Sequence, residues 1–383
     1  MTRLPSFRRN RRRTIAVCAV LVAGVALAAC SSSSSSTGST SSTGSAASSG
    51  GGSSFKITYS NSYLGNTFHQ VLIKDAQTTA SDAEKQGLIS HFTITDANSS
   101  PTTQAQQIRN DIVQGYNAII VDASSGTALN SAIQEACAHG ILVIAANEVV
   151  TAPCAYNVEI NVPIETKLQM ESIGQALNGK GNVLDDQGIA GTLPEAQFLT
   201  GVQQGLKEYP DLKIVGHVYG QWTTTITDQQ ISQALPSLPS IQAVVSEGAG
   251  EVGVVQAFKA ANRPVPLVYF GNAGQDLRTW ASLIQTNPNY HVWSISSFPD
   301  TSGFAIYAAL AMLQHKVHLD SKAVWFPILQ IKQNYLQQWI AATPVNSQAD
   351  FQFTYPETVK LLGEEPNVPA VIAPPPGGPI PGL

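Results

Sequence analysis

The stretch FKITYSNSYLGNTFHQVLIKDAQTTASDAEKQG, residues 55–87, contains the unit from which most of the chain is built. Its first six residues form a short apolar run, which is typical of a buried strand. Its second half has apolar residues at a spacing of three to four, which predicts an amphipathic helix. Between them, SNSYLGNTFHQ (residues 60–70) places Phe68 and His69 at a junction where neither side chain needs to be buried.

The same alternation continues along the chain. Helical spacing separates the apolar runs, as in residues 102–115, where Ile108, Ile112 and Val113 are expected on one helix face before Gly115. Repeated strand–helix alternation predicts parallel sheets covered by helices on both faces, an α/β fold. The further strand-like runs are residues 91–96, 117–123, 141–146, 182–187, 213–219, 242–247, 266–270 and 291–296.

These strands are too many for one ordinary doubly wound sheet, and a division near residues 156–165 gives two halves of similar size. Ligands of open parallel sheets bind beyond the carboxyl ends of the strands, so two halves can enclose a ligand between their loops. The last strand-like run, residues 325–331, precedes a short helix and a tail. Residues 366–383 are rich in Pro and Gly, so we expect them to be extended or disordered, with partial docking as the alternative.

Residues 1–54 differ from the rest. Five arginines between positions 8 and 13 precede a short apolar core that ends in Leu-Ala-Ala-Cys at Cys30, a pattern that resembles a lipoprotein signal peptide. The resemblance implies cleavage before Cys30 and a lipid on its sulfur; an ordinary cleavage site is the alternative. Residues 31–54 are mostly Ser and Gly, which predicts a flexible tether. We therefore expect an extracytoplasmic domain anchored to a bacterial membrane.

Loss of residues 1–29 leaves 15 basic against 26 acidic residues, a net charge of −11. This balance argues against nucleic acid as a partner. Cys137 and Cys154 flank one predicted strand outside the cytoplasm, so a disulfide between them is expected, with two buried thiols as the alternative. No CxxC motif or His/Cys cluster indicates a metal, and no cofactor is expected.

Several strand-to-helix loops resemble those of the ribose-binding group of type I periplasmic binding proteins. QGIAGT at residues 187–192 and the GNTFH loop at 65–69 are the most specific. VIAANE (143–148), VVSEGAGEVG (244–253) and SISSFPD (294–300) follow in matching order. The resemblance covers about residues 55–333.

This resemblance implies two α/β/α lobes with parallel sheets, joined by three crossovers, that close on a small ligand. It also implies delivery of that ligand to an ABC permease and ATPase complex, by a protein that is expected to be a monomer and no enzyme. The expected parts are a signal peptide (1–29), a tether (30–54), an N-terminal lobe (55–160 and 298–325), a C-terminal lobe (161–297 and 326–340) and a C-terminal extension (341–383).

Sugars present weakly polar faces and hydroxylated edges, so their sites combine aromatic surfaces with a polar rim. Phe68 and His69 match the aromatics of the first lobe in this family, and Trp222 matches that of the second. A core role for Phe68 or Trp222 is the alternative. The polar rim is expected from the same loops: Asn66, Asn147, Glu148, Glu247, Asn272 and Ser297. Each of these residues also has an alternative role. Asn66 could serve only as the cap of its own helix, and Asn272 could only form a turn. Glu148 and Glu247 could be ordinary solvated carboxylates.

The chain departs from the family at three places. Asn147-Glu148 stands where an Asp-Arg pair is usual, Ala196 where an arginine follows the QGIAGT loop, and no Asp accompanies Asn272. The two arginines that donate paired hydrogen bonds to sugar hydroxyls in this family are therefore missing. Ribose itself is not favoured, and the expected ligand is a neutral sugar or polyol, with an amine-bearing ligand as the alternative.

Three other functions need to be compared with ligand delivery to an importer. A membrane sensor uses the same two-lobe module and is not separated from an importer by this chain. A secreted hydrolase would need a nucleophile with a base or paired carboxylates. Asp185-Asp186 is an exposed-looking acidic pair, but adjacent residues of a strand point to opposite faces, so the two do not form such a pair. GAGEVG (248–253) fits the glycine-rich motif of dinucleotide-binding proteins, but the next strand ends without the acidic residue that would bind the ribose. The small residues of GAGEVG are instead expected to let the backbone approach the cleft.

Overall fold

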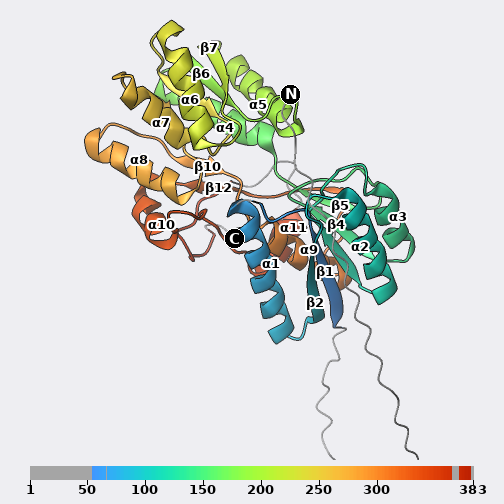
Figure 1. The fold of residues 1–383 in the computed structure, drawn as a ribbon. Coiled ribbons are helices and arrows are strands. Elements are labelled where there is room, and N and C mark those ends of the chain that lie inside the picture. Colours follow the sequence, from blue (N-terminus) through green and yellow to red (C-terminus); the bar gives the residue numbers. More distant parts are fainter. Residues whose placement is uncertain (1–53, 66, 365–370, 381–383) are drawn as a thin grey trace, which may run out of the picture. The chain divides into compact units, whose positions relative to one another are not determined.

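A computed structural model describes residues 54–65, 67–364 and 371–380 (Figure 1). The predicted signal peptide, the lipidated Cys30 and the tether up to residue 53 lie outside the described residues, as does Asn66. In the described part of the chain, no helix combines the length and apolar character needed to cross a membrane.

The first sheet contains six strands in the order β11-β5-β4-β3-β1-β2, all paired in parallel. Tyr59 of β1, for example, lies opposite Ile94 of β2 and Ile120 of β3. The strands are β1 (Phe55–Asn61), β2 (Ile89–Asp96), β3 (Ala118–Val121), β4 (Leu142–Ala146), β5 (Tyr156–Glu159) and β11 (Ala323–Trp325).

Helices cover both faces of this sheet because alternate strand residues point to opposite sides. Ile119 and Val121 pack with helices α2 (Pro101–Gln114) and α3 (Asn130–Ala138) in one apolar cluster. Ala118 and Ile120 join the cluster that contains α1 (Thr67–Lys85) and α9 (Thr301–Leu313), which pack on each other. In α2, Ile108 is buried as expected, but Val113 is 88% exposed, because its position turns it away from the sheet.

The second sheet has a parallel part in the order β7-β6-β8-β9, and an isolated parallel bridge between Phe270 and Ser294 leads on to β10-β12-β13. Strand β12 is antiparallel to β10 and parallel to β13. The strands are β6 (Lys180–Gln187), β7 (Asp211–Tyr219), β8 (Ala243–Ser246), β9 (Leu267–Val268), β10 (Ser294–Ser296), β12 (Ile328–Ile331) and β13 (Val371–Ile372).

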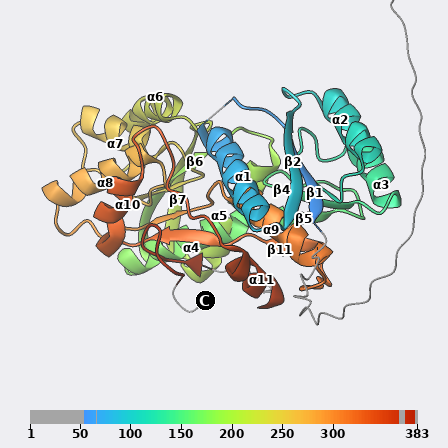
Figure 2. The ribbon, with the colours of Figure 1, turned by 90° about the horizontal axis from the view of Figure 1, so that it is seen from below.

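Three helix pairs pack around the second sheet: α4 on α5, α6 on α7, and α8 on α10 (Figure 1 and Figure 2). Their bounds are α4 (Val162–Ala176), α5 (Leu193–Glu208), α6 (Thr224–Ala234), α7 (Glu251–Ala260), α8 (Gly274–Thr286) and α10 (Leu336–Ala342), with short 3₁₀ turns η1 (Leu235–Ser237) and η2 (Gln333–Tyr335). The chain passes between the sheets after β5, after β10 and after β11, which gives three crossovers. The predicted α/β fold with parallel sheets is confirmed.

Helix starts follow the sequence signals. Ser100, Asn161 and Thr192 each accept a hydrogen bond from a backbone N–H one turn on, and a proline stands in the first turn of each helix. Such caps satisfy amide groups that have no partner inside the helix. The cap at Asn161 sets the start of α4 directly after a crossover, which orients the first turns of that helix.

The C-terminal extension is folded over much of its described length, and for residues 371–380 the structure agrees with the alternative of partial docking rather than with a disordered tail. Helix α11 (Tyr355–Glu364) packs on α9 (Figure 2), and β13 pairs in parallel with β12. The indole N–H of Trp339 donates to the carbonyl of Pro374 at 3.3 Å. Short apolar segments such as Val371–Ile372 dock because the edge of β12 offers free backbone partners, which composition does not reveal.

Phe353 anchors the extension in an aromatic cluster. Its ring centroid lies 5.3 Å from that of Phe304 on α9 and 5.9 Å from that of Phe326. Its backbone N–H donates to Asp300 Oδ2 at 2.8 Å. The extension therefore contacts elements of the first sheet's layer through α11 and Phe353, and the second sheet through β13.

Three carboxylates meet where the extension passes α1. Gln352 Nε2 donates to Asp75 Oδ1 at 2.8 Å. Burial raises the pKa of Asp75 to about 8, and the nearby Asp350 charge adds to the rise. Burial likewise raises the pKa of Asp350 to about 6 and that of Asp300 well above its usual range. Like charges with few compensating donors favour the protonated forms.

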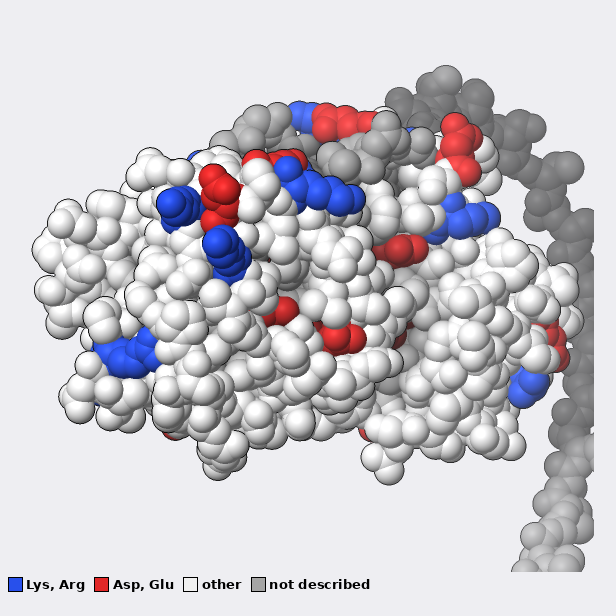
Figure 3. All heavy atoms as spheres, turned by 90° about the horizontal axis from the view of Figure 1, so that it is seen from above, with Lys and Arg blue, Asp and Glu red and all other residues white. Residues whose placement is uncertain are grey.

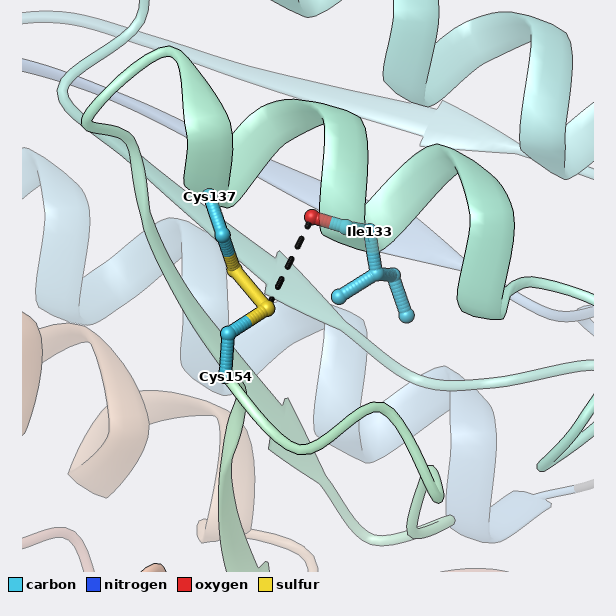
Figure 4. The surroundings of a disulfide bond; sticks show 3 residues. All are labelled: Ile133, Cys137 and Cys154. Atoms are coloured by element: carbon cyan, nitrogen blue, oxygen red, sulfur yellow. Dashed lines mark hydrogen bonds between the residues drawn. A yellow bond between two sulfur atoms is a disulfide. The ribbon is translucent and has the colours of Figure 1, made fainter.

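Cys137 and Cys154 are joined by a disulfide, with Cα atoms 6.4 Å apart (Figure 4). Cys137 lies near the end of α3, and Cys154 lies in the loop before β5. The bridge closes a loop of 17 residues beside Ile133. It therefore ties one helix layer to a strand of the first sheet.

Replacing both cysteines by alanine should lower the free energy of unfolding by about 3 kcal/mol, because the bridge restricts the unfolded chain. Urea denaturation of the oxidised protein and of the double variant measures the difference, with the reduced wild-type protein as control. Two free thiols in the native, oxidatively prepared protein would contradict the bridge.

Asp75→Asn should stabilise the protein at about pH 8 and have little effect at about pH 4. A carboxyl group whose native pKa lies above the ordinary value of about 3.9 contributes stability at low pH, and this is lost as pH rises toward the native pKa. The gain should reach at least about 1 kcal/mol, or a Tm increase of about 2–4 °C. Asp82→Asn, on the same helix beside Lys85, is the control and should show no such pH-dependent gain.

Candidate ligand-binding site

A cavity of about 520 Å³ lies at the carboxyl ends of strands from both sheets. Its lining comes from the loops that follow β1, β4, β7 and β8, from the first turns of α4, and from the segment between β9 and α8. The predicted site residues that line it are Phe68, His69, Asn147, Glu148, Trp222, Glu247, Asn272 and Ser297. Contact of these residues with a ligand stays a prediction, and Asn66 lies outside the described residues.

His69 is held against Asp122, a buried residue at the end of β3. His69 Nε2 lies 3.3 Å from Asp122 Oδ2, and the ring of Tyr63 covers the imidazole with centroids 4.3 Å apart. Only 6% of His69 is exposed. Tyr63 and Phe68 therefore offer the aromatic surface on this side, and His69 supports them.

Asp122 also organises the neighbouring polar groups. Ser62 Oγ donates to its Oδ2 at 2.6 Å, and Asn147 Nδ2 donates to its Oδ1 at 3.2 Å. Asn147 adopts a left-handed backbone conformation (φ 68°), which asparagine tolerates better than most residues. The turn at Asn147 directs Glu148 toward the cavity, where burial and the Asp122 charge raise the pKa of Glu148.

On the opposite side, Trp222 follows β7 in a turn where Gln221 and Trp222 both have positive φ angles (52° and 55°). Such backbone is strained for residues other than glycine and marks a position held by its surroundings. The ring packs over Gly188, where any Cβ would clash with both the indole and the Glu247 carboxylate. This contact explains why the first glycine of QGIAGT, Gly188, cannot carry a side chain.

Glu247 is fixed by donors from two elements. The backbone N–H of Gly188 donates to its Oε2 at 2.6 Å, and the Trp222 indole is a second donor. Burial raises the pKa of Glu247 to about 7, although both hydrogen bonds oppose the rise. Its other oxygen is buried without a hydrogen-bond partner in the described part of the chain.

Asn272 fastens the C-terminal extension to the cavity wall. Its Nδ2 donates to the carbonyls of Ser297 (3.1 Å) and Ala349 (3.0 Å), and its own carbonyl accepts from the Ala349 N–H at 2.7 Å. These bonds bring Gln348 into the cavity lining. Sequence reasoning missed Gln348, because nothing in a segment read as a tail indicates where it docks.

Sequence reasoning also missed Glu165, Thr166 and Gln169 on α4, which line the cavity from the crossover side. Burial and the nearby Glu247 charge raise the pKa of Glu165 to about 8, whereas the Ser297 N–H lowers it. One signal in the sequence could have indicated these residues: Asn161 and Pro163 mark the start of a helix at the predicted division between the two halves. Residues in the first turns of such a helix face the space between the sheets.

Asp185 and Asp186 are buried, so their exposed-looking interpretation is wrong. Asp186 accepts hydrogen bonds from Ser246 Oγ (3.1 Å) and Thr227 Oγ1 (3.4 Å), and Asp185 accepts from Gln187 Nε2 (2.7 Å). Neither lines the cavity. A Cβ on Gly250 would clash with Asp186 and Thr227, and a Cβ on Gly253 would clash with the backbone of Thr224, so these two glycines of GAGEVG permit close packing behind the site.

The cavity lining contains no Lys or Arg among the described residues. On the face shown in Figure 3, the described basic side chains are scattered and form no continuous patch. No group of three or more His, Cys, Asp or Glu residues in the described ranges is arranged to hold a metal ion. The site can therefore offer aromatic faces, amides and carboxylates to a ligand.

The family described as periplasmic binding protein domain matches residues 57–316. A xylitol-binding protein of Mycolicibacterium smegmatis is 31% identical over 176 residues, which are 45% of this chain and 50% of that protein. The match thus spans about half the length of this curated relative.

Solved structures show the same fold. A solute-binding protein of an ABC transporter from Thermobispora bispora superimposes with a TM-score of 0.69 at 29% identity, over 84% of this chain and 99% of that one. A periplasmic ribose ABC transporter protein from Conexibacter woesei gives a TM-score of 0.64 at 20% identity, over 76% and 97%. Because the family match covers most of the chain and the two-sheet fold agrees with it, this protein belongs to the type I periplasmic binding proteins, the family of solute-binding proteins that includes the sugar binders of ABC transporters.

Proposed function

We propose that this protein captures a small sugar or polyol in the cavity and delivers it, chemically unchanged, to an ABC importer. The observation that carries the proposal is the pairing of Tyr63 and Phe68 from one sheet with Trp222 from the other around one polar cavity. Flat aromatic groups suit the C–H faces of a sugar, and the amides and carboxylates between them suit its hydroxyls. The names of the relatives, a xylitol-binding protein and a ribose transporter component, support this ligand class.

The protein captures its ligand by closing around it. The ligand contacts both Phe68 and Trp222 only when the two sheets approach each other, so binding shifts the equilibrium between the open and the closed state toward the closed one. The importer then distinguishes loaded from empty protein by shape. A single copy of the chain suffices for this mechanism, so we propose that the protein acts as a monomer.

We also propose that Cys30 carries a lipid and that residues 31–54 tether the folded domain to the outer side of the cell membrane. The arginine-rich start, the short apolar segment and the Leu-Ala-Ala-Cys ending support this arrangement. Anchoring keeps the domain close to a permease, which raises its effective concentration there.

Trp222→Ala should weaken sugar or polyol binding by about 1.5–3 kcal/mol, because the ligand loses a large apolar face. Titration calorimetry with a panel of pentoses, hexoses and polyols gives the affinities, and mass spectrometry of co-purified small molecules directs the choice. Trp222→Phe should retain part of the affinity, and Val113→Ala, on the exposed face of α2, should retain all of it. Unchanged affinity of Trp222→Ala would remove this residue from the site; a folded protein that binds nothing in the panel would refute the ligand class.

Cys30→Ala should release the protein from the membrane fraction of the producing bacterium into the soluble fraction, because no thiol remains for the lipid. Fractionation followed by immunoblotting measures the distribution, and mass spectrometry of the wild-type N-terminal peptide detects the lipid. Membrane retention of the alanine variant would contradict the anchor and leave the ligand-binding proposal untouched.

A further inference from the structure

Three hydrogen-bond acceptors converge on one side of the cavity: Glu165 and Gln169 of α4, and Glu247 after β8, here termed the acceptor cluster. Gln169 is only 5% exposed, and its Oε1 is buried without a hydrogen-bond partner in the described ranges. Glu247 Oε1 is in the same condition. A buried acceptor without a donor is costly, so these atoms indicate that a donor from outside the chain completes the site.

The three side chains line the same cavity. Glu165 and Gln169 stand four residues apart on α4 and therefore share one helix face. Glu165 and Glu247 line the same cavity, and the charge of Glu247 adds to the effect of burial in raising the pKa of Glu165. The N–H of Gly188 and the Trp222 indole donate to Glu247 but leave its Oε1 without a partner in the described ranges, and the N–H of Ser297 donates to Glu165.

An ammonium group fits this arrangement better than a hydroxyl. It supplies three N–H donors and needs no acceptor of its own, whereas each hydroxyl donates one hydrogen bond and also requires a donor. No Lys or Arg lines the cavity to neutralise the carboxylates from within the described chain. A metal ion is not indicated either, since the described residues contain no suitable group of ligands.

We propose that the preferred ligand is a polyhydroxylated amine, whose ammonium group sits on the acceptor cluster of Glu165, Gln169 and Glu247 while its hydroxylated part lies against Trp222. This inference rests on the proposed function and narrows its ligand class from sugars and polyols to their amino derivatives. Hydrogen bonds from an ammonium to carboxylates are stronger than those between neutral groups, so the amine should bind at least about tenfold tighter than its parent.

The test compares matched ligands by titration calorimetry at about pH 8, where Glu247, with its pKa raised to about 7, is largely ionised and Glu165, with its pKa raised to about 8, is about half ionised. The pairs are xylitol with 1-amino-1-deoxyxylitol, sorbitol with 1-amino-1-deoxysorbitol, and glucose with glucosamine; N-acetylglucosamine keeps the nitrogen without the charge. At least one amine should bind about tenfold or more tightly than its parent, and acetylation should remove the advantage. Parents that bind as tightly as their amines would overturn the inference and leave the proposed function standing. Absence of binding by every ligand to the folded protein would overturn both.

Two substitutions locate the preference. Glu165→Gln and Gln169→Met preserve side-chain volume and should each reduce amine affinity about tenfold or more, with a change below about threefold for the parent. Glu171→Gln, the same substitution on the same helix but at a residue paired with Lys167 outside the cavity, is the matched control. Melting curves confirm that each variant is folded. An amine preference that survives both substitutions would overturn the assignment of the ammonium group to this cluster.

Discussion

Parallel strand pairing is the constraint on which the site depends. Strands that run in the same direction bring their carboxyl ends to one edge of the sheet, so the loops after β1 and β4 meet at one edge and those after β7 and β8 at another. The crossovers then present both edges to a single cavity. Side chains distant in sequence, such as Phe68 and Trp222, come to line one space without any direct contact between them.

The sequence allowed the fold and the loop-borne part of the site to be predicted. Strand ends can be read from short apolar runs, and Trp222 and Glu247 follow such ends directly. Glu165 and Gln169 were missed because they lie on a helix, where a polar residue at regular spacing is ordinarily solvent-facing. Gln348 was missed because its position depends on the hydrogen bonds between Asn272 and Ala349, which link residues 77 positions apart. Contacts of that kind leave no local pattern.

Buried carboxylates recur through the second half of the molecule, and hydrogen-bond donors rather than basic residues hold them. Asp186 is bound by hydroxyl groups, and Asp276 accepts from the N–H of Ala273 at 3.2 Å. Glu251 is buried, and burial together with the charges of Asp276 and Asp186 raises its pKa well above the usual range. Burial without basic partners therefore favours the protonated, neutral forms of these carboxyl groups.

The folded C-terminal extension has a practical consequence for protein engineering. A shortened chain that stops after α10 would lack Ala349 and Phe353, so the Asn272 amide would lose an acceptor and the aromatic rings of Phe304 and Phe326 would face water. It would also lack Gln348, and with it part of the cavity wall. Biosensors derived from this scaffold should therefore carry reporter domains elsewhere, because the described parts of the extension, residues 343–364 and 371–380, are an integral part of the fold.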